Sequence, residues 1–253
     1  AAGNVTLKRL LLYATFFSQD RAMITYWQQN DGKLLKIKKE ELDETQRTWV
    51  DARVVTRDDV ELLQEEYKID PEHILDILDP DELSRLEDGD TYILTILRLP
   101  FYDPAAETQY STVPLGIIIK ENCIITICWT DCEVLKDFSM GRVKGITLSD
   151  FPAFIMRLLG RANMTFLRYL KEINRRSAAI QNELQLAVEN REIMQLLGLE
   201  KSLVYFTTSL KSNQLLLEKY RKTKLIKLDY EDMDWLDDVE IDSHQAIEMA
   251  DTY

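Results

Sequence analysis

The sequence contains few of the residues that interrupt regular secondary structure. Only 8 of its 253 residues are glycine and 6 are proline, well below the roughly 12% that these two types make up in average proteins. This scarcity excludes a collagen-like or low-complexity chain and favours long helices. The length is sufficient for one large domain or two modest ones with a substantial core.

Long apolar segments are also lacking. No uncharged apolar run approaches the roughly 18 to 20 residues that a membrane-spanning helix requires. Acidic side chains outnumber basic ones by 44 to 31, which gives a formal net charge of −13. Because such a chain as a whole repels nucleic acid and anionic lipid, we expect a soluble protein with no nucleic-acid partner.

Cysteine and histidine are scarce as well. The cysteines Cys123, Cys128 and Cys132 do not have a zinc-site spacing and have no histidine nearby, so we interpret them as buried thiols in a reducing compartment. His73 and His244 lie far apart and beside no candidate nucleophile. The sequence also lacks phosphate-binding-loop, dinucleotide-binding, zinc-protease and serine-hydrolase motifs. We therefore predict that the protein is not an enzyme.

The first 22 residues are treated separately. Lys8 and Arg9 precede a short apolar stretch, as in a signal peptide, but no suitable cleavage site follows. Met23 then begins a strand-like run. We interpret residues 1–22 as a non-native or tag segment and Met23 as the start of the natural sequence.

Residues 23–147 are predicted to form an α/β domain. Apolar runs around the Lys120-Glu121-Asn122 turn indicate a hairpin covered by helices on both faces. Helical spacing favours a helix over residues 58–67, with Thr56 as its N-cap, and another that begins near Asp70-Pro71. Strands are expected, from their β-branched and aromatic content, at residues 24–28, 34–38, 48–54, 91–101, 111–120 and 123–129.

Residues 148–253 are predicted to be helical. Residues 151–173 have the pattern of an amphipathic helix. The segment 196–220 carries a heptad repeat, which indicates either antiparallel helices packed within one subunit or a seam between subunits. Asn213 is its polar exception, and we expect a turn at Gly198, which weakens a helix by roughly 1 kcal/mol relative to alanine. The repeat comprises Leu196, Leu203, Leu210 and Leu217, with Leu199, Phe206 and Tyr220 three positions on.

Acidic residues are concentrated in two blocks. Residues 229–242 contain eight carboxylates, and residues 70–82 contain six around an apolar helix. Clustered carboxylates repel one another unless solvent, a basic surface or a hard cation offsets the repulsion. The blocks are therefore solvated faces or cation sites; neither has the EF-hand pattern.

Taken in order, several segments resemble the cytoplasmic part of the CorA family of magnesium channels and transporters. Trp49-Val50-Asp51 resembles the family's tryptophan-containing strand, and residues 69–78 resemble its Ile-His-Pro-Leu-x-x-Glu-Asp-Ile-Leu segment. The segments 85–87, 92–97, 113–119 and 122–127 follow in the family's order.

The resemblance implies an α+β protein, an α/β/α sandwich followed by long stalk-type helices. In the family two membrane helices come next, with a Gly-Met-Asn signature that this sequence lacks. Because the chain stops at Tyr253, where the stalk would continue, we expect it to be the cytoplasmic part of a cell-membrane protein that is truncated before those helices. The resemblance further implies a homopentamer.

The family also implies ligands for divalent ions between neighbouring subunits. Asp76 matches the second acidic residue of the Glu-Asp-Ile-Leu pattern, whereas Leu75 replaces the first. The expected stalk position falls near Ile241, so we choose Asp242 from proximity and add Asp238 as a further candidate. The expected ion is Mg²⁺, regulatory or transported, with Co²⁺, Ni²⁺ or Zn²⁺ as alternatives.

The predicted function is thus divalent-cation sensing in a CorA-like channel, in which Mg²⁺ between subunits stabilises the closed state. One alternative is a zinc-transporting relative on the same scaffold. A second is a soluble helical adaptor that binds partners through the heptad seam. A third, weaker alternative is a carboxylate-based metal hydrolase.

Overall fold

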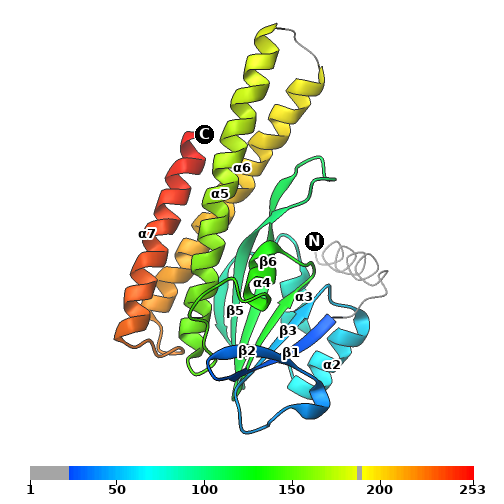
Figure 1. Ribbon diagram of the computed structural model, residues 1–253, viewed down its shortest axis with the longest axis vertical. Helices are drawn as coiled ribbons and strands as arrows, with labels where there is room; N and C mark the ends of the chain where they lie inside the picture. The colour runs from blue at the N-terminus through cyan, green and yellow to red at the C-terminus, as the bar shows by residue number, and fades with distance from the viewer. Residues whose placement is uncertain (1–22, 187–189) are drawn as a thin grey trace, which may run out of the picture.

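The computed structural model describes residues 23–186 and 190–253, which form a seven-stranded mixed sheet and a layer of long helices (Figure 1). The expected segment 1–22 lies outside the described residues. All six expected strands are confirmed with small shifts, and one short strand, β4, was not expected. The sheet order is β2-β1-β3-β7-β6-β5-β4. The strands are β1 Met23–Asn30, β2 Lys33–Ile37, β3 Thr48–Arg53, β4 Arg85–Asp88, β5 Ile93–Tyr102, β6 Tyr110–Lys120 and β7 Cys123–Cys128.

Helices cover both faces of this sheet, as its apolar strands predicted. The strands β3 and β7 are parallel, while β6 and β7 form the expected antiparallel hairpin. One core lies between the sheet and α2 and α3, and a second lies between the sheet and α4 to α7. The helices are η1 Lys39–Glu41, α2 Arg57–Tyr67, α3 Pro71–Leu78, α4 Glu133–Ser139, α5 Phe151–Leu186, α6 Asn190–Lys222 and α7 Tyr230–Thr252.

The two short helices α2 and α3 begin at the caps that the sequence predicts. The Thr56 side chain accepts from the Asp59 backbone N–H, and the Asp59 carboxylate accepts from the Thr56 N–H in return, which is a capping box. The Asp70 carboxylate accepts from the Glu72 N–H, and Pro71 follows at the first helical position. These caps fix where α2 and α3 start.

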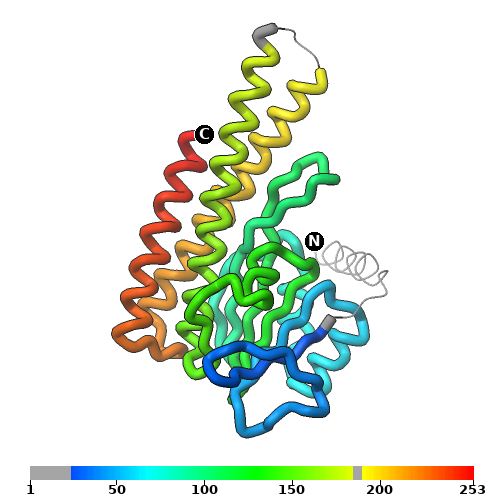
Figure 2. Tube along the Cα trace, viewed as in Figure 1, coloured from blue at the N-terminus to red at the C-terminus, as the bar shows by residue number. Residues whose placement is uncertain are grey.

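The long helices α5, α6 and α7 pack side by side, and α6 runs antiparallel to the other two (Figures 1 and 2). Helix α5 extends well past the expected end at residue 173. The heptad residues Leu199, Phe206, Leu210 and Leu217 are buried within the chain, which confirms the intrachain interpretation of the seam.

The expected turn at Gly198 was wrong, because α6 continues through it. A Cβ atom at this position would lie 3.1 Å from the Glu107 backbone oxygen, in the connection between β5 and β6. Glycine allows that connection to approach the helix closely, and this approach compensates for its poor helix propensity.

The polar member of the seam, Asn213, attaches α6 to the sheet. Its side chain accepts from the Arg98 backbone N–H and donates to the Arg98 carbonyl oxygen, both at 2.8 Å. Strand β4 pairs with β5 only as far as Ile96, so Asn213 takes the place of a neighbouring strand. The amide satisfies a sheet edge that would otherwise be buried without partners.

The division at residues 147 and 148 stays a prediction. Side chains from the strands and from α4 to α7 share one continuous core. The cysteines are free, with Cys128 and Cys132 buried, as expected for structural thiols. Burial raises the pKa of Cys132 to about 11, which disfavours the reactive thiolate. Within the described ranges, no helix combines the length and the apolar character that crossing a membrane requires.

Candidate functional site

The first predicted site residue, Asp76, lies on α3, on one outer side of the sheet. Ile74 and Ile77 of the same helix are fully buried against the sheet, which turns Asp76 toward β4. Its carboxylate lies 2.8 Å from Nη2 of Arg85, and its side chain is 17% exposed. Asp76 is therefore a partly buried, ion-paired group and not a fully solvated acid.

The guanidinium of Arg85 forms ion pairs with three carboxylates. Besides Asp76 it pairs with Glu82 and, through Nε at 3.0 Å, with Glu87. Burial raises the pKa of Glu82, and the Arg85 charge opposes that rise. We call Asp76, Glu82, Arg85 and Glu87 the α3–β4 cluster. It holds three carboxylates against one cation, so it remains electronegative and offers the oxygen ligands that hard divalent ions prefer.

The cluster extends to one of the two histidines. The Nε2 atom of His73 lies 3.3 Å from Glu87, and its Nδ1 atom lies 2.7 Å from the Tyr92 hydroxyl. Tyr92 in turn accepts from the Asp70 backbone N–H at 3.0 Å. His73 therefore has a structural role in joining α3 to the sheet. Residues 85–87 were noted only as a segment that resembles the family, and their place beside Asp76 was not predicted because strand β4 was not expected.

The other two predicted site residues, Asp238 and Asp242, lie together on α7. They are one helical turn apart and line a cleft between α5 and α7. Asp238 is exposed and Asp242 is half-buried. Burial, together with the neighbouring charge of Asp238, raises the pKa of Asp242. This pair lies in the helical layer, across the sheet from Asp76, so a site containing both would need a second copy of the chain.

Two further acids of the 229–242 block cap the helix on which they lie. Asp229 and Asp232 form a capping box at the start of α7, and Asp150 accepts from the Ala153 N–H at the start of α5. The three carboxylates lie within 4.8 Å of one another. Each is engaged by the N-terminus of a helix, where negative charge is favourable. Asp150 lies outside the 229–242 block in the sequence, so its place beside Asp229 and Asp232 was not predicted.

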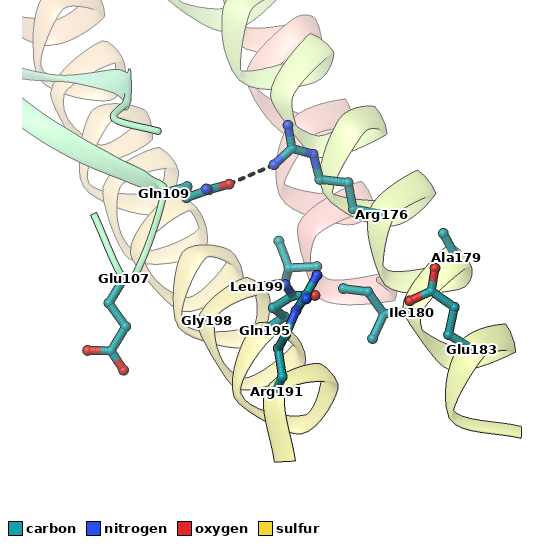
Figure 3. A pocket seen from close by; sticks show the side chains of 10 residues that line it. All are labelled: Glu107, Gln109, Arg176, Ala179, Ile180, Glu183, Arg191, Gln195, Gly198 and Leu199. Atoms are coloured by element: carbon teal, nitrogen blue, oxygen red, sulfur yellow. Dashed lines mark hydrogen bonds between the residues drawn. The ribbon is translucent and has the colours of Figure 1, made fainter. Parts of the chain in front are cut away.

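A second hollow, of about 380 Å³, lies where α5 and α6 approach the connection between β5 and β6 (Figure 3). Its Arg176 donates to Gln109 Oε1 at 2.6 Å and pairs with Glu172 at 2.9 Å. Arg191 and Glu183 also line it (Figure 3). Because Arg176 is already satisfied from within the chain, we assign no ligand to this hollow.

The sequence and the fold described above agree with one known family. Residues 44–253 match the family described as CorA-like Mg²⁺ transporter protein. The chain belongs to this CorA-like family. The cobalt/magnesium transport protein CorA of Methanocaldococcus jannaschii is 29% identical over 238 residues, which cover 88% of this chain and 71% of that protein.

Solved CorA structures share the fold. The complete structure of the CorA magnesium transporter from M. jannaschii has a TM-score of 0.79 and 21% identity, covering 93% of this chain and 74% of that one. The soluble domain of the same organism's CorA has a TM-score of 0.76 and 23% identity, covering 91% and 92%. The predicted α+β class, with an α/β/α sandwich and long helices, is thereby confirmed.

Proposed function

We propose that this chain is the cytoplasmic, divalent-cation-sensing part of a CorA-like magnesium channel or transporter of the cell membrane. Mg²⁺ bound between subunits of a homopentamer would stabilise the closed state. Membership of the CorA-like family supports transport over the metal-hydrolase alternative. The observation that carries the sensing role is the α3–β4 cluster, in which Asp76 lies among further carboxylates.

The ion pair between Asp76 and Arg85 limits how tightly Mg²⁺ could bind. An incoming ion must compete with a guanidinium 2.8 Å away. Two unit charges about 4 Å apart interact by roughly 1 kcal/mol in water and about 4 kcal/mol at an effective dielectric near 20. Summed over the several interfaces of a ring, gains of this size reach the roughly 5.5 kcal/mol that shifts an equilibrium from 1:99 to 99:1. A weak site is therefore sufficient, and we expect millimolar affinity.

Asp238 and Asp242 are the proposed ligands from the stalk side. Their cleft also contains Arg157 and Lys144, and such cations weaken the attraction for Mg²⁺. We therefore expect Asp76 to contribute more to Mg²⁺ binding than Asp238 and Asp242 do. The two sides can be tested separately, because they lie on different elements.

The alternatives differ in what they predict. A zinc-transporting relative would respond to Zn²⁺ at lower concentration than to Mg²⁺. The adaptor alternative loses its main support, because the heptad seam is occupied within the chain. The natural reading frame beyond Tyr253 separates transporter from adaptor, since a transporter requires two apolar stretches of about 20 residues.

The test measures the thermal unfolding midpoint and the sedimentation of the chain as MgCl₂ is raised from 0 to about 20 mM, roughly the range that a weak site requires. CoCl₂, NiCl₂ and ZnCl₂ are titrated in parallel series. We expect Mg²⁺ to raise the midpoint and to favour the larger assembly. Asp76→Asn should remove most of this increment, and Asp242→Asn combined with Asp238→Asn should reduce it.

The matched control is Asp88→Asn, which neutralises an exposed carboxylate on the neighbouring strand β4 and should leave the increment unchanged. The comparison uses the Mg²⁺-dependent increment of each variant, so the lost ion pair with Arg85 does not affect it. The sensing role would be refuted if Mg²⁺ did not raise the thermal midpoint. It would also be refuted if the increment persisted in a variant that combines Asp76→Asn, Asp238→Asn and Asp242→Asn.

A further inference from the structure

We propose that the cleft between α5 and α7 binds a small organic anion with an apolar body. The cavity has a volume of about 560 Å³, within the roughly 300 to 1,000 Å³ of small-molecule sites. One wall is the face of α5 that carries Met156, Gly160 and Met164, and the facing wall is α7 with Trp235 and Val239. Such a mainly apolar lining with a few polar groups is typical of ligand sites.

The hollow exists because Gly160 lies on the face of α5 that contacts α7. A Cβ atom at this position would meet only Val239 Cγ2, at an ordinary contact distance of 3.8 Å. Packing therefore does not require glycine here, although glycine in a helix interior costs about 1 kcal/mol relative to alanine. Position 160 thus has glycine although alanine would fit there and would stabilise the helix.

Arg157 supplies the group that would recognise an anion. Its guanidinium carbon lies 3.5 Å from the centroid of the Trp235 ring. Gly145 also lies beside this guanidinium: φ is +70° there, and a Cβ atom would lie 2.8 Å from Nη2. The guanidinium therefore lies over the indole ring and close to the Gly145 backbone. Over residues 23–186 and 190–253, no carboxylate pairs with it within 4.0 Å.

The other basic residues of the cleft differ from Arg157. Arg142 and Arg161 both pair with the buried carboxylate of Asp137. Lys144, on the connection between α4 and α5, is exposed and lines the same cavity. Lys144 and Arg157 therefore form a basic end of the cleft, in a chain whose net charge is −13.

The ligand class follows from these features. A carboxylate, sulfonate or phosphate would bind Arg157 and Lys144 through charge-assisted hydrogen bonds. Its apolar body would lie along Met156, Met164 and Val239, which line the cavity beside Gly160; of these, Met164 is the exposed one. The inference uses no residue of the α3–β4 cluster, whereas Asp238 and Asp242, the proposed Mg²⁺ ligands of α7, line the same cleft and oppose an anion there.

The probe is 8-anilinonaphthalene-1-sulfonate, an anion with an aromatic body, titrated into the folded full chain and followed by its fluorescence. Its uncharged counterpart, N-phenyl-1-naphthylamine, serves as the second probe. We expect saturable binding of the anion and at least tenfold weaker binding of the neutral compound. Arg157→Gln should weaken anion binding about tenfold, and Lys144→Gln, in an exposed segment, should weaken it by about threefold.

Gly160→Leu tests the hollow directly and should abolish binding. Its matched controls on α5 are Ala178→Leu, which adds leucine to an exposed position, and Arg175→Gln, which removes an exposed arginine; neither should change the affinity. Circular dichroism verifies that each variant is folded. Equal affinity for the two probes, or unchanged anion binding in both Lys144→Gln and Arg157→Gln, would overturn the proposal. If the parent chain binds the anion but shows no response to Mg²⁺, only the sensing role is refuted.

Discussion

Gly116 allows α3, and with it Asp76, to lie directly against the sheet. It occupies the middle of β6, between Ile96 of β5 and Ile127 of β7. A Cβ atom there would come within 2.9 Å of three side-chain carbons of Ile77, on α3. Real Cβ atoms do not approach other atoms so closely, so either α3 or Ile77 must move in Gly116→Ala.

The magnitude follows from two opposing terms. Overpacking a filled core costs typically about 1 to 3 kcal/mol, and this clash, with Ile77 fully buried, belongs near the upper end. Replacing a strand glycine by alanine returns roughly 0.5 to 1 kcal/mol of conformational entropy. We therefore expect Gly116→Ala to lower the free energy of unfolding by about 2 kcal/mol, which corresponds to a Tm lower by about 4 to 8 °C in a chain of this size.

The measurement is urea unfolding of Gly116→Ala, Ile77→Ala and the double variant. Ile77→Ala alone should cost about 2 to 5 kcal/mol through its cavity. In the double variant the new methyl group occupies part of that cavity, so the coupling should be favourable by at least about 1 kcal/mol. Gly160→Ala, where the new Cβ is in ordinary contact, is the control and should stabilise by up to about 1 kcal/mol.

Two results would contradict this account of Gly116. The first is a Gly116→Ala variant as stable as the parent. The second is additivity of the two substitutions within about 0.5 kcal/mol, which would mean that the residues do not compete for space. Because α3 carries Asp76, we also expect Gly116→Ala to reduce the Mg²⁺-dependent increment.

Two further predictions concern polar contacts. Asn213→Leu leaves the buried backbone N–H and carbonyl of Arg98 without their partner, so it should cost about 2 to 4 kcal/mol in urea unfolding; a cost below about 0.5 kcal/mol would show that the amide is dispensable. Burial opposes ionisation of Glu133, but hydrogen bonds, chiefly from Arg168, outweigh it and lower the pKa of Glu133 below its ordinary value. The ionised form is therefore the more stable one in the folded state, and its contribution is full above about pH 5 and lost as the pH falls through the lowered folded pKa. The stability difference between the parent and Glu133→Gln should thus be largest near pH 7 and shrink below about pH 4; a pH-independent difference would contradict this.

Much of the fold could be predicted from local patterns. Capping signals at Thr56 and Asp70 act within one turn of helix, so they located α2 and α3 correctly. The apolar strands β6 and β7 predicted cover on both faces because period and burial are properties of the strand itself. The heptad repeat from Leu199 to Leu217 predicted a packed helix face. It did not predict whether that face packs within the chain or against another subunit, because a repeat indicates that a face is buried and not which element covers it.

The sequence alone determined the family, the α+β class and the candidacy of Asp76, because these depend on the order of residues along the chain. Only the tertiary structure decided what surrounds Asp76, since Arg85 and Glu87 come from a four-residue strand too short to be recognised. It also decided that Gly198 continues a helix and that Gly160 opens a cleft. Each of these outcomes depends on which atom from a distant segment lies opposite, and the order of residues does not specify that contact.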